Sequence, residues 1–113
     1  MDDKNSIVYL YGYSLAKRDE FKSLFKILNE QINQETLIEF ILIHDGVVRT
    51  TNKGINPKFL KKLLELPIIV YAMIPDIKAR GMDPENLNNK IKGIGYSELV
   101  DILVNTQKIV SWL

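Results

Sequence analysis

Apolar and polar residues form two kinds of pattern along the chain. Short apolar runs rich in β-branched and aromatic residues predict strands, and they cover 7–11, 37–43, 68–74, 91–94 and 108–113. Longer stretches with apolar residues three or four positions apart predict amphipathic helices, and they cover 17–32, 57–66, 76–80 and 97–104. Because strands and helices alternate, the pattern predicts an α/β fold with a mostly parallel sheet of about five strands.

The apolar run at 67–74 predicts the strand around which the sheet is built. It contains no charged residue, and its β-branched and aromatic side chains lie between two prolines. Such a run is typical of a strand covered on both faces, so we expect it in the middle of the sheet. Pro75 suits the first turn of a following helix because it has no N–H to lose there, and Gly81 suits the left-handed residue that ends the helix.

Polar residues and prolines predict where the other helices begin. Asn56 followed by Pro57 predicts an N-cap and the first helical residue of the second long helix. Ser97 is predicted to cap the last helix, and Asp83 followed by Pro84 predicts a further short one.

The composition limits the class of protein. A chain of 113 residues that is 46% hydrophobic and 26% charged fits one domain, residues 1–113, and can bury a core without metals or disulfides. A net charge of +1 implies no general attraction to nucleic acid or to an anionic membrane. No apolar run approaches the roughly 20 residues of a membrane span, and no secretory signal is recognisable, so we expect a cytoplasmic protein. Without metal-ligand spacing or a phosphate-binding motif, we expect no cofactor.

The candidate site is the edge where the strands end. In doubly wound sheets, ligands collect where loops leave the carboxyl ends of the strands, so we expect the segments 12–14, 44–46 and 73–76 to be neighbours. His44 and Asp45 could form an acid–base pair, or His44 could bind a metal. The same Asp-Gly sequence after a strand is also common turn chemistry.

Two further residues each allow two interpretations. Arg80, at the end of a helical turn, could hold an anion or a partner carboxylate with two N–H groups, or could simply favour the helix dipole. Trp112 is either held in the core by the last strand or part of a subunit interface. The candidate ligand or partner contacts are therefore His44, Asp45, Gly46, Asp76, Arg80 and Trp112.

Four short motifs occur in an order that resembles a known family. They are Asp45-Gly46-Val47, Val70-Tyr71-Ala72 leading through Asp76 to Ala79-Arg80-Gly81, Tyr96-Ser97, and the terminal Val110-Ser111-Trp112-Leu113. Together they resemble the DsrH/TusB family of sulfur-relay proteins over most of the chain. The resemblance implies a DsrE/DsrF/DsrH-like fold, which is a three-layer α/β/α sandwich. It also implies a role in sulfur transfer for tRNA 2-thiouridine synthesis or sulfur oxidation, in a hetero-oligomer with DsrE-like and DsrF-like subunits.

The sequence departs from some members of this family in one respect, since it contains no cysteine. Those relatives carry a cysteine on the first helix that is suspected of handling persulfide, and this chain has Leu24 or a close neighbour there. A persulfide must sit on a thiol, so this chain cannot itself carry sulfur. The resemblance therefore implies a non-catalytic subunit that acts through protein contacts.

Two other functions remain open at this point. The chain could be a homo-oligomeric α/β module that binds a small ligand at the edge formed by His44, Asp45 and Asp76. An independent enzyme is a third hypothesis, against which stands the lack of any paired nucleophile and base.

Overall fold

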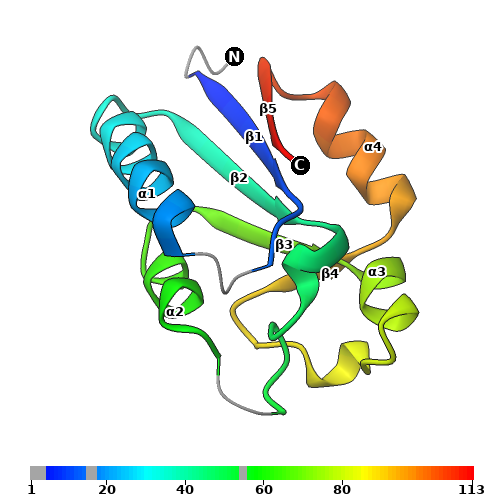
Figure 1. The fold of residues 1–113 in the computed structure, drawn as a ribbon. Helices are drawn as coiled ribbons and strands as arrows, with labels where there is room; N and C mark the ends of the chain where they lie inside the picture. Colours follow the sequence, from blue (N-terminus) through cyan, green and yellow to red (C-terminus); the bar gives the residue numbers. More distant parts are fainter. Residues whose placement is uncertain (1–4, 15–17, 54–55) are drawn as a thin grey trace.

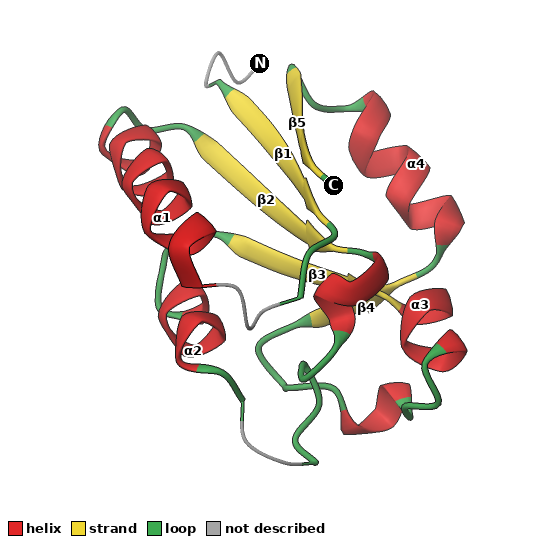
Figure 2. Ribbon diagram, viewed as in Figure 1, coloured by secondary structure: helices red, strands yellow, loops and turns green. Residues whose placement is uncertain are grey.

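The computed structural model describes residues 5–14, 18–53 and 56–113, which form one five-stranded parallel sheet with helices on both faces (Figure 1, Figure 2). The strands are β1 (Ser6–Tyr11), β2 (Leu37–Leu42), β3 (Ile69–Met73), β4 (Lys92–Ile94) and β5 (Lys108–Trp112). The helices are α1 (Arg18–Asn33), α2 (Lys58–Leu64), α3 (Ile74–Ala79) and α4 (Tyr96–Val104), with short 3₁₀ helices η1 (His44–Val47) and η2 (Pro84–Asn86). The predicted three-layer α/β fold is confirmed. The first helix was expected from Lys17, which lies outside the described residues.

Alternation along the strands gives the sheet two apolar faces. Tyr9 and Phe40 lie on the face covered by α1 and α2, where their rings stack with centroids 5.9 Å apart. Val8 and Ile41 lie on the opposite face, which α4 covers with partly buried side chains. The strand period of two therefore supplies both helical layers with a packing surface. No helix of the described ranges has the length and apolar character needed to cross a membrane.

The strand order is β4-β3-β2-β1-β5, so the middle strand is β2. The prediction that the run at 67–74 forms the middle is therefore wrong by one place. Strand β3 does lie inside the sheet, between β2 and the short β4, and its residues from Val70 to Met73 are buried. An uncharged apolar run indicates that a strand is buried on both faces. Every interior strand of the sheet shares this property, so the run does not show which of them lies in the middle.

Two predicted helix caps are wrong. The amide of Asn56 does not cap α2 but donates to the carbonyls of Arg49 (2.9 Å) and Thr51 (3.0 Å) in the preceding loop. Helix α4 is capped at Gly95, whose N–H donates to Glu98 Oε1 at 3.0 Å, rather than at Ser97. Contacts within the loop therefore decide how Asn56 is used, whereas at α4 a local contact from Glu98, three residues after Gly95, places the cap earlier than expected.

The end of α3 matches the prediction. Pro75 lies in the first turn, and Gly81 adopts a left-handed φ of +72° just beyond the helix. The weak strand signal at 91–94 is also confirmed, as β4 pairs with β3. The short helix predicted at Asp83 and Pro84 forms as η2, where the Asp83 carboxylate accepts the N–H of Glu85 at 2.9 Å.

Gly81→Ala should lower the free energy of unfolding by about 1 kcal/mol, because a Cβ disfavours the left-handed backbone. A Cβ at Gly81 would meet no atom within 4 Å, so backbone conformation is the sole cause. Urea unfolding measures the loss. Gly95→Ala is the matched control, because its φ is −98° and the nearest atom lies 3.8 Å from the added Cβ. Equal losses in the two variants would contradict the assignment.

Candidate functional site

The loops that follow β1, β2 and β3 meet at one edge of the sheet. The N–H of Ile43 donates to the carbonyl of Tyr11 at 2.9 Å, which joins the first two loops. The N–H of His44 donates to Asp76 Oδ2, also at 2.9 Å, which joins the second loop to the start of α3. The prediction that these segments are neighbours is confirmed.

Arg80 binds two carboxylates of its own chain. Its Nη2 and Nε lie 3.1 and 3.3 Å from Asp45 Oδ1, and its Nη1 lies 3.8 Å from Asp76 Oδ1. The Asp45 side chain is 68% exposed, so solvent screens this pair and its contribution to stability is small. The network's main effect is geometric, because it ties η1 to α3. We call His44, Asp45, Asp76 and Arg80 the edge network.

His44, a member of the edge network, has an uncommon backbone conformation. Its φ is +50°, in the left-handed region that histidine enters more readily than most residues. The hydrogen bond from its N–H to Asp76 supports this conformation, and the side chain is exposed. Across the described ranges, no three His, Asp or Glu side chains are grouped so that they could hold a metal ion.

Gly46 is buried directly behind the edge network. A Cβ on this residue would lie 2.5 Å from the carbonyl oxygen of Tyr11, so only glycine allows η1 to pack this closely on the end of β1. The Gly46 N–H donates to the carbonyl of Ile43 at 2.8 Å. Close packing between η1 and β1 therefore explains why a glycine occupies position 46.

Strand β5 continues the same edge. The N–H of Gly12 donates to the carbonyl of Trp112 at 2.9 Å, and the Tyr13 hydroxyl donates to the carbonyl of Leu113 at 2.7 Å. The partly buried Trp112 packs against the core on the α1 and α2 face, as the first of its two interpretations expected. A Cβ on Gly12 would lie 2.9 Å from Leu113 and 3.5 Å from His44, so both residues are its neighbours.

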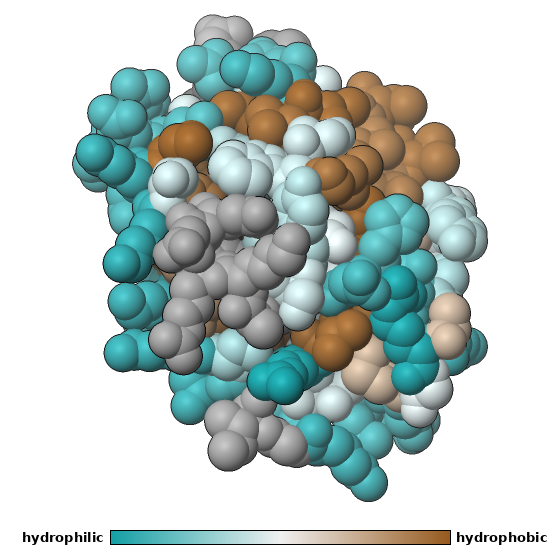
Figure 3. Space-filling model, in the orientation of Figure 1, coloured by the Kyte–Doolittle hydropathy of each residue, from teal (hydrophilic) through white to brown (hydrophobic). Residues whose placement is uncertain are grey.

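Helix α4 and strand β5 expose apolar side chains together. Figure 3 shows apolar side chains gathered over these two elements, at the upper right of the view. Among the described residues, strand β5 pairs with β1 alone, so it is an edge strand of the sheet. We call this the α4/β5 surface, and its exposed members are Tyr96 (65%), Val100 (55%), Val104 (72%), Ile109 (46%) and Leu113 (59%).

A polar pair inside the sheet was missed by sequence reasoning. The Tyr71 hydroxyl on β3 donates to Glu39 Oε2 on β2 at 2.7 Å. Burial, and then the hydrogen bond and charge of Glu39, raise the pKa of Tyr71 to about 12. The available signal was a glutamate inside the otherwise apolar run 37–43.

The pH dependence of stability should reflect this pair. The pKa of Tyr71 is about 12 in the folded chain, against an ordinary value of 10.0. The contribution of the protonated hydroxyl to the free energy of unfolding is therefore complete below pH 10 and is lost as the pH rises through 12. In Glu39→Gln the pKa should fall but stay raised, because burial is the larger cause. Ultraviolet absorbance titration measures the pKa of Tyr71, and the Tyr71→Phe variant identifies which part of the tyrosine absorbance change belongs to this residue. An unchanged titration in Glu39→Gln would exclude the role of the carboxylate.

A second polar cluster holds the long loop between β2 and α2. Asn88 Nδ2 donates to Asn56 Oδ1 at 3.1 Å, and the Asn88 N–H donates to the carbonyl of Thr50 at 2.8 Å. Thr50 is fully buried and Thr51 is 6% exposed. These contacts join residues that are distant in the sequence, so no local pattern indicates them.

Comparison with known proteins gives a consistent result. A family model described as "DsrH like protein" matches residues 14–109. Protein TusB of Pectobacterium atrosepticum is 33% identical over 72 residues, covering 64% of this chain and 72% of that protein. Protein TusB of Buchnera aphidicola subsp. Baizongia pistaciae is 28% identical over 98 residues, covering 87% and 97%.

Solved structures show the same fold. The ychN protein from E. coli superposes with a TM-score of 0.72 at 16% identity, covering 96% of this chain and 99% of that one. A protein of unknown function from Methanobacterium thermoautotrophicum superposes with a TM-score of 0.64 at 16% identity, covering 97% and 100%. At this identity the likeness concerns the fold alone.

Proposed function

The chain belongs to the DsrH family, and on that basis we propose that it is a cysteine-free subunit of a sulfur-relay complex that acts through protein contacts. Family membership and the TusB relatives support a sulfur-relay role in general. The absence of cysteine from all 113 residues carries the rest of the proposal. Relay steps pass sulfur as a persulfide, and a chain without a thiol has no atom on which to hold it.

The α4/β5 surface supports the contact role. Tyr96, Val100 and Val104 follow one another at intervals of four, so they form one outward stripe on α4. The inward side of the same helix also packs apolar side chains on the sheet. A helix that is apolar on both sides is typical of one covered on both sides, so a partner would complete its burial.

The edge network extends this surface around the end of the sheet. Leu113 of the α4/β5 surface and His44 of the edge network both lie next to Gly12, within 3.5 Å of the position that its Cβ would take. The proposed contact region therefore includes Asp45 and Arg80 together with the α4/β5 surface, while Gly46 and Trp112 support it from within the fold. Its proposed partners are cysteine-bearing DsrE-like and DsrF-like subunits, whose reactive thiol this chain would cover or position.

The alternative of a ligand site at the edge of His44, Asp45 and Asp76 has less support. Arg80 binds both carboxylates at this edge, and the N–H of His44 occupies the second oxygen of Asp76. A ligand would have to displace these contacts.

The test is recovery of the tagged protein from its own host at native expression, with native mass spectrometry of the intact complex and alkylation of persulfides. We expect DsrE-like or DsrF-like chains in fixed stoichiometry, with persulfide on a partner's cysteine. Recovery of the chain only with itself would overturn the subunit proposal and favour a homo-oligomeric module.

A further inference from the structure

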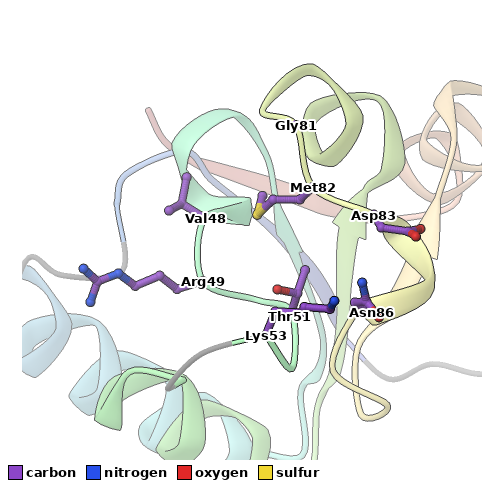
Figure 4. A pocket seen from close by; sticks show the side chains of 8 residues that line it. All are labelled: Val48, Arg49, Thr51, Lys53, Gly81, Met82, Asp83 and Asn86. Carbon is purple, nitrogen blue, oxygen red and sulfur yellow. The ribbon is translucent and has the colours of Figure 1, made fainter.

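We propose that a hollow beside the edge network binds a small organic anion. The hollow lies between the loop after η1 and the loop between α3 and η2, with a volume of about 520 Å³, within the range of small-molecule sites (Figure 4). Its lining residues are Val48, Arg49, Thr51, Lys53, Gly81, Met82, Asp83 and Asn86. The oxyanion group of the ligand would lie at the Lys53 end and its apolar part at the Met82 end. This inference does not depend on the proposed relay function.

One end of the hollow offers hydrogen-bond donors. Figure 4 shows Thr51, Lys53 and Asn86 together at this end, and the Asn52 N–H donates to the carbonyl of Asn86 at 2.6 Å, which brings the two loops side by side. A hydroxyl, an ammonium and an amide can each donate to an oxyanion. Charge-assisted bonds from an ammonium are the strongest of these.

The charges of the lining favour an anion. Both ion pairs formed within the described residues involve Arg80, so neither Lys53 nor Arg49 has a carboxylate partner there. Asp83 is the one acidic residue of the lining; its Oδ1 accepts the N–H of Glu85, and Figure 4 shows its side chain directed away from the donor end. Figure 4 also shows the Arg49 side chain directed away from the donor end, so Lys53 is the cation at this end, and the one carboxylate of the lining is already engaged.

The other end of the hollow is apolar. The Met82 side chain extends toward Val48 across the gap between the two loops (Figure 4). A flexible thioether adapts to ligands of different shape, and an aliphatic side chain opposite it provides a dry contact. An anion with an attached ring or alkyl group therefore fits better than a bare inorganic ion.

The donor end is held rigidly before any ligand binds. Thr51 forms an antiparallel bridge with Leu87, and Asn56 binds the carbonyls of Arg49 and Thr51. Asn88 in turn binds Asn56, which joins all three loop segments. Because the backbone of these loops is already held in place, little loop ordering would be required on binding.

The test is a titration of the purified ¹⁵N-labelled chain followed by backbone amide shifts. Phenyl phosphate is the probe, inorganic phosphate tests the contribution of the ring, and benzyl alcohol tests the requirement for charge. We expect phenyl phosphate to give saturable shifts at residues 51, 53, 82 and 86, inorganic phosphate to bind more weakly there, and benzyl alcohol to cause none. The absence of saturable shifts at these residues with phenyl phosphate would overturn the proposal.

Two pairs of variants test the donors. Lys53→Gln should weaken binding roughly five- to tenfold, since it removes one exposed charged donor, whereas Lys61→Gln on the outside of α2 should not. Asn86→Asp keeps the side-chain shape but puts a negative charge at the donor end, so binding should be lost. Asn89→Asp, outside the hollow, is its control. If Lys53→Gln and Asn86→Asp both bound phenyl phosphate as tightly as the unaltered chain, the anion would have to bind elsewhere. The amide spectra also show whether each variant is folded.

Discussion

Gly46→Ala should lower the free energy of unfolding by about 2–4 kcal/mol, the largest loss expected for a methyl group added to any glycine that the structure describes. The added Cβ would lie 2.5 Å from the carbonyl oxygen of Tyr11, and that oxygen also accepts the N–H of Ile43. The obstacle is therefore a backbone carbonyl that a hydrogen bond already holds in place at a buried junction. Relief requires η1 to move away from β1, which strains the link from His44 to Asp76.

Urea unfolding with an unchanged m-value measures this loss. Gly12→Ala is the matched control, because its Cβ would also meet a close atom, at 2.9 Å, but that atom is the Cδ2 of Leu113. The end of this exposed side chain can rotate away, so we expect a loss below about 1 kcal/mol. If the two variants were equally stable, the tight junction between η1 and β1 would not be important for the fold.

The double variant Val100→Asp/Val104→Asp should weaken assembly with the partner subunits roughly 100-fold. Each aspartate would place an unpaired charge in an apolar interface, at a cost of about 1–3 kcal/mol, and each 1.4 kcal/mol is tenfold in affinity. Both valines are more than half exposed in the isolated chain, at 55% and 72%. The free energy of unfolding should therefore fall by less than about 1 kcal/mol.

Native mass spectrometry and a binding titration with the co-purified partners measure this effect. Ile27→Asp on α1 is the matched control, since Ile27 is also an exposed apolar residue, at 39%, but lies on the other helical layer. The double variant should lose the partner while the control retains it. Retention by both would remove the α4/β5 surface from the proposed interface, and loss by both would indicate a general effect of surface charge.

Most of the element order was predictable because it depends on local patterns. Runs such as 7–11 and 37–43 are too short for helices and rich in β-branched residues, and they became β1 and β2. The parallel arrangement followed from the helix between them, since adjacent parallel strands need a long connection. Backbone chemistry at Pro75 and Gly81 is likewise local, and it fixed both ends of α3 as expected.

The candidate edge was also predictable in outline. Parallel strands bring their carboxyl ends together, so the residues after β1, β2 and β3 had to approach one another. Which of them form contacts was not determined by the sequence, because a side chain such as Arg80 has several possible partners. The structure pairs it with Asp45, 35 positions away, as well as with Asp76 on its own helix.

By itself, the sequence determined the α/β class, most element boundaries and the absence of a thiol, because each depends on residue identity or local spacing. Only the tertiary structure decided the strand order, the use of Asn56 in the loop rather than as a cap, and the pairing of Tyr71 with Glu39. The apolar side chains of α4 and β5 were visible as a pattern, but their exposure depends on which neighbours cover them. Long-range packing chooses among partners that are equivalent in the sequence, and that choice has no local signal.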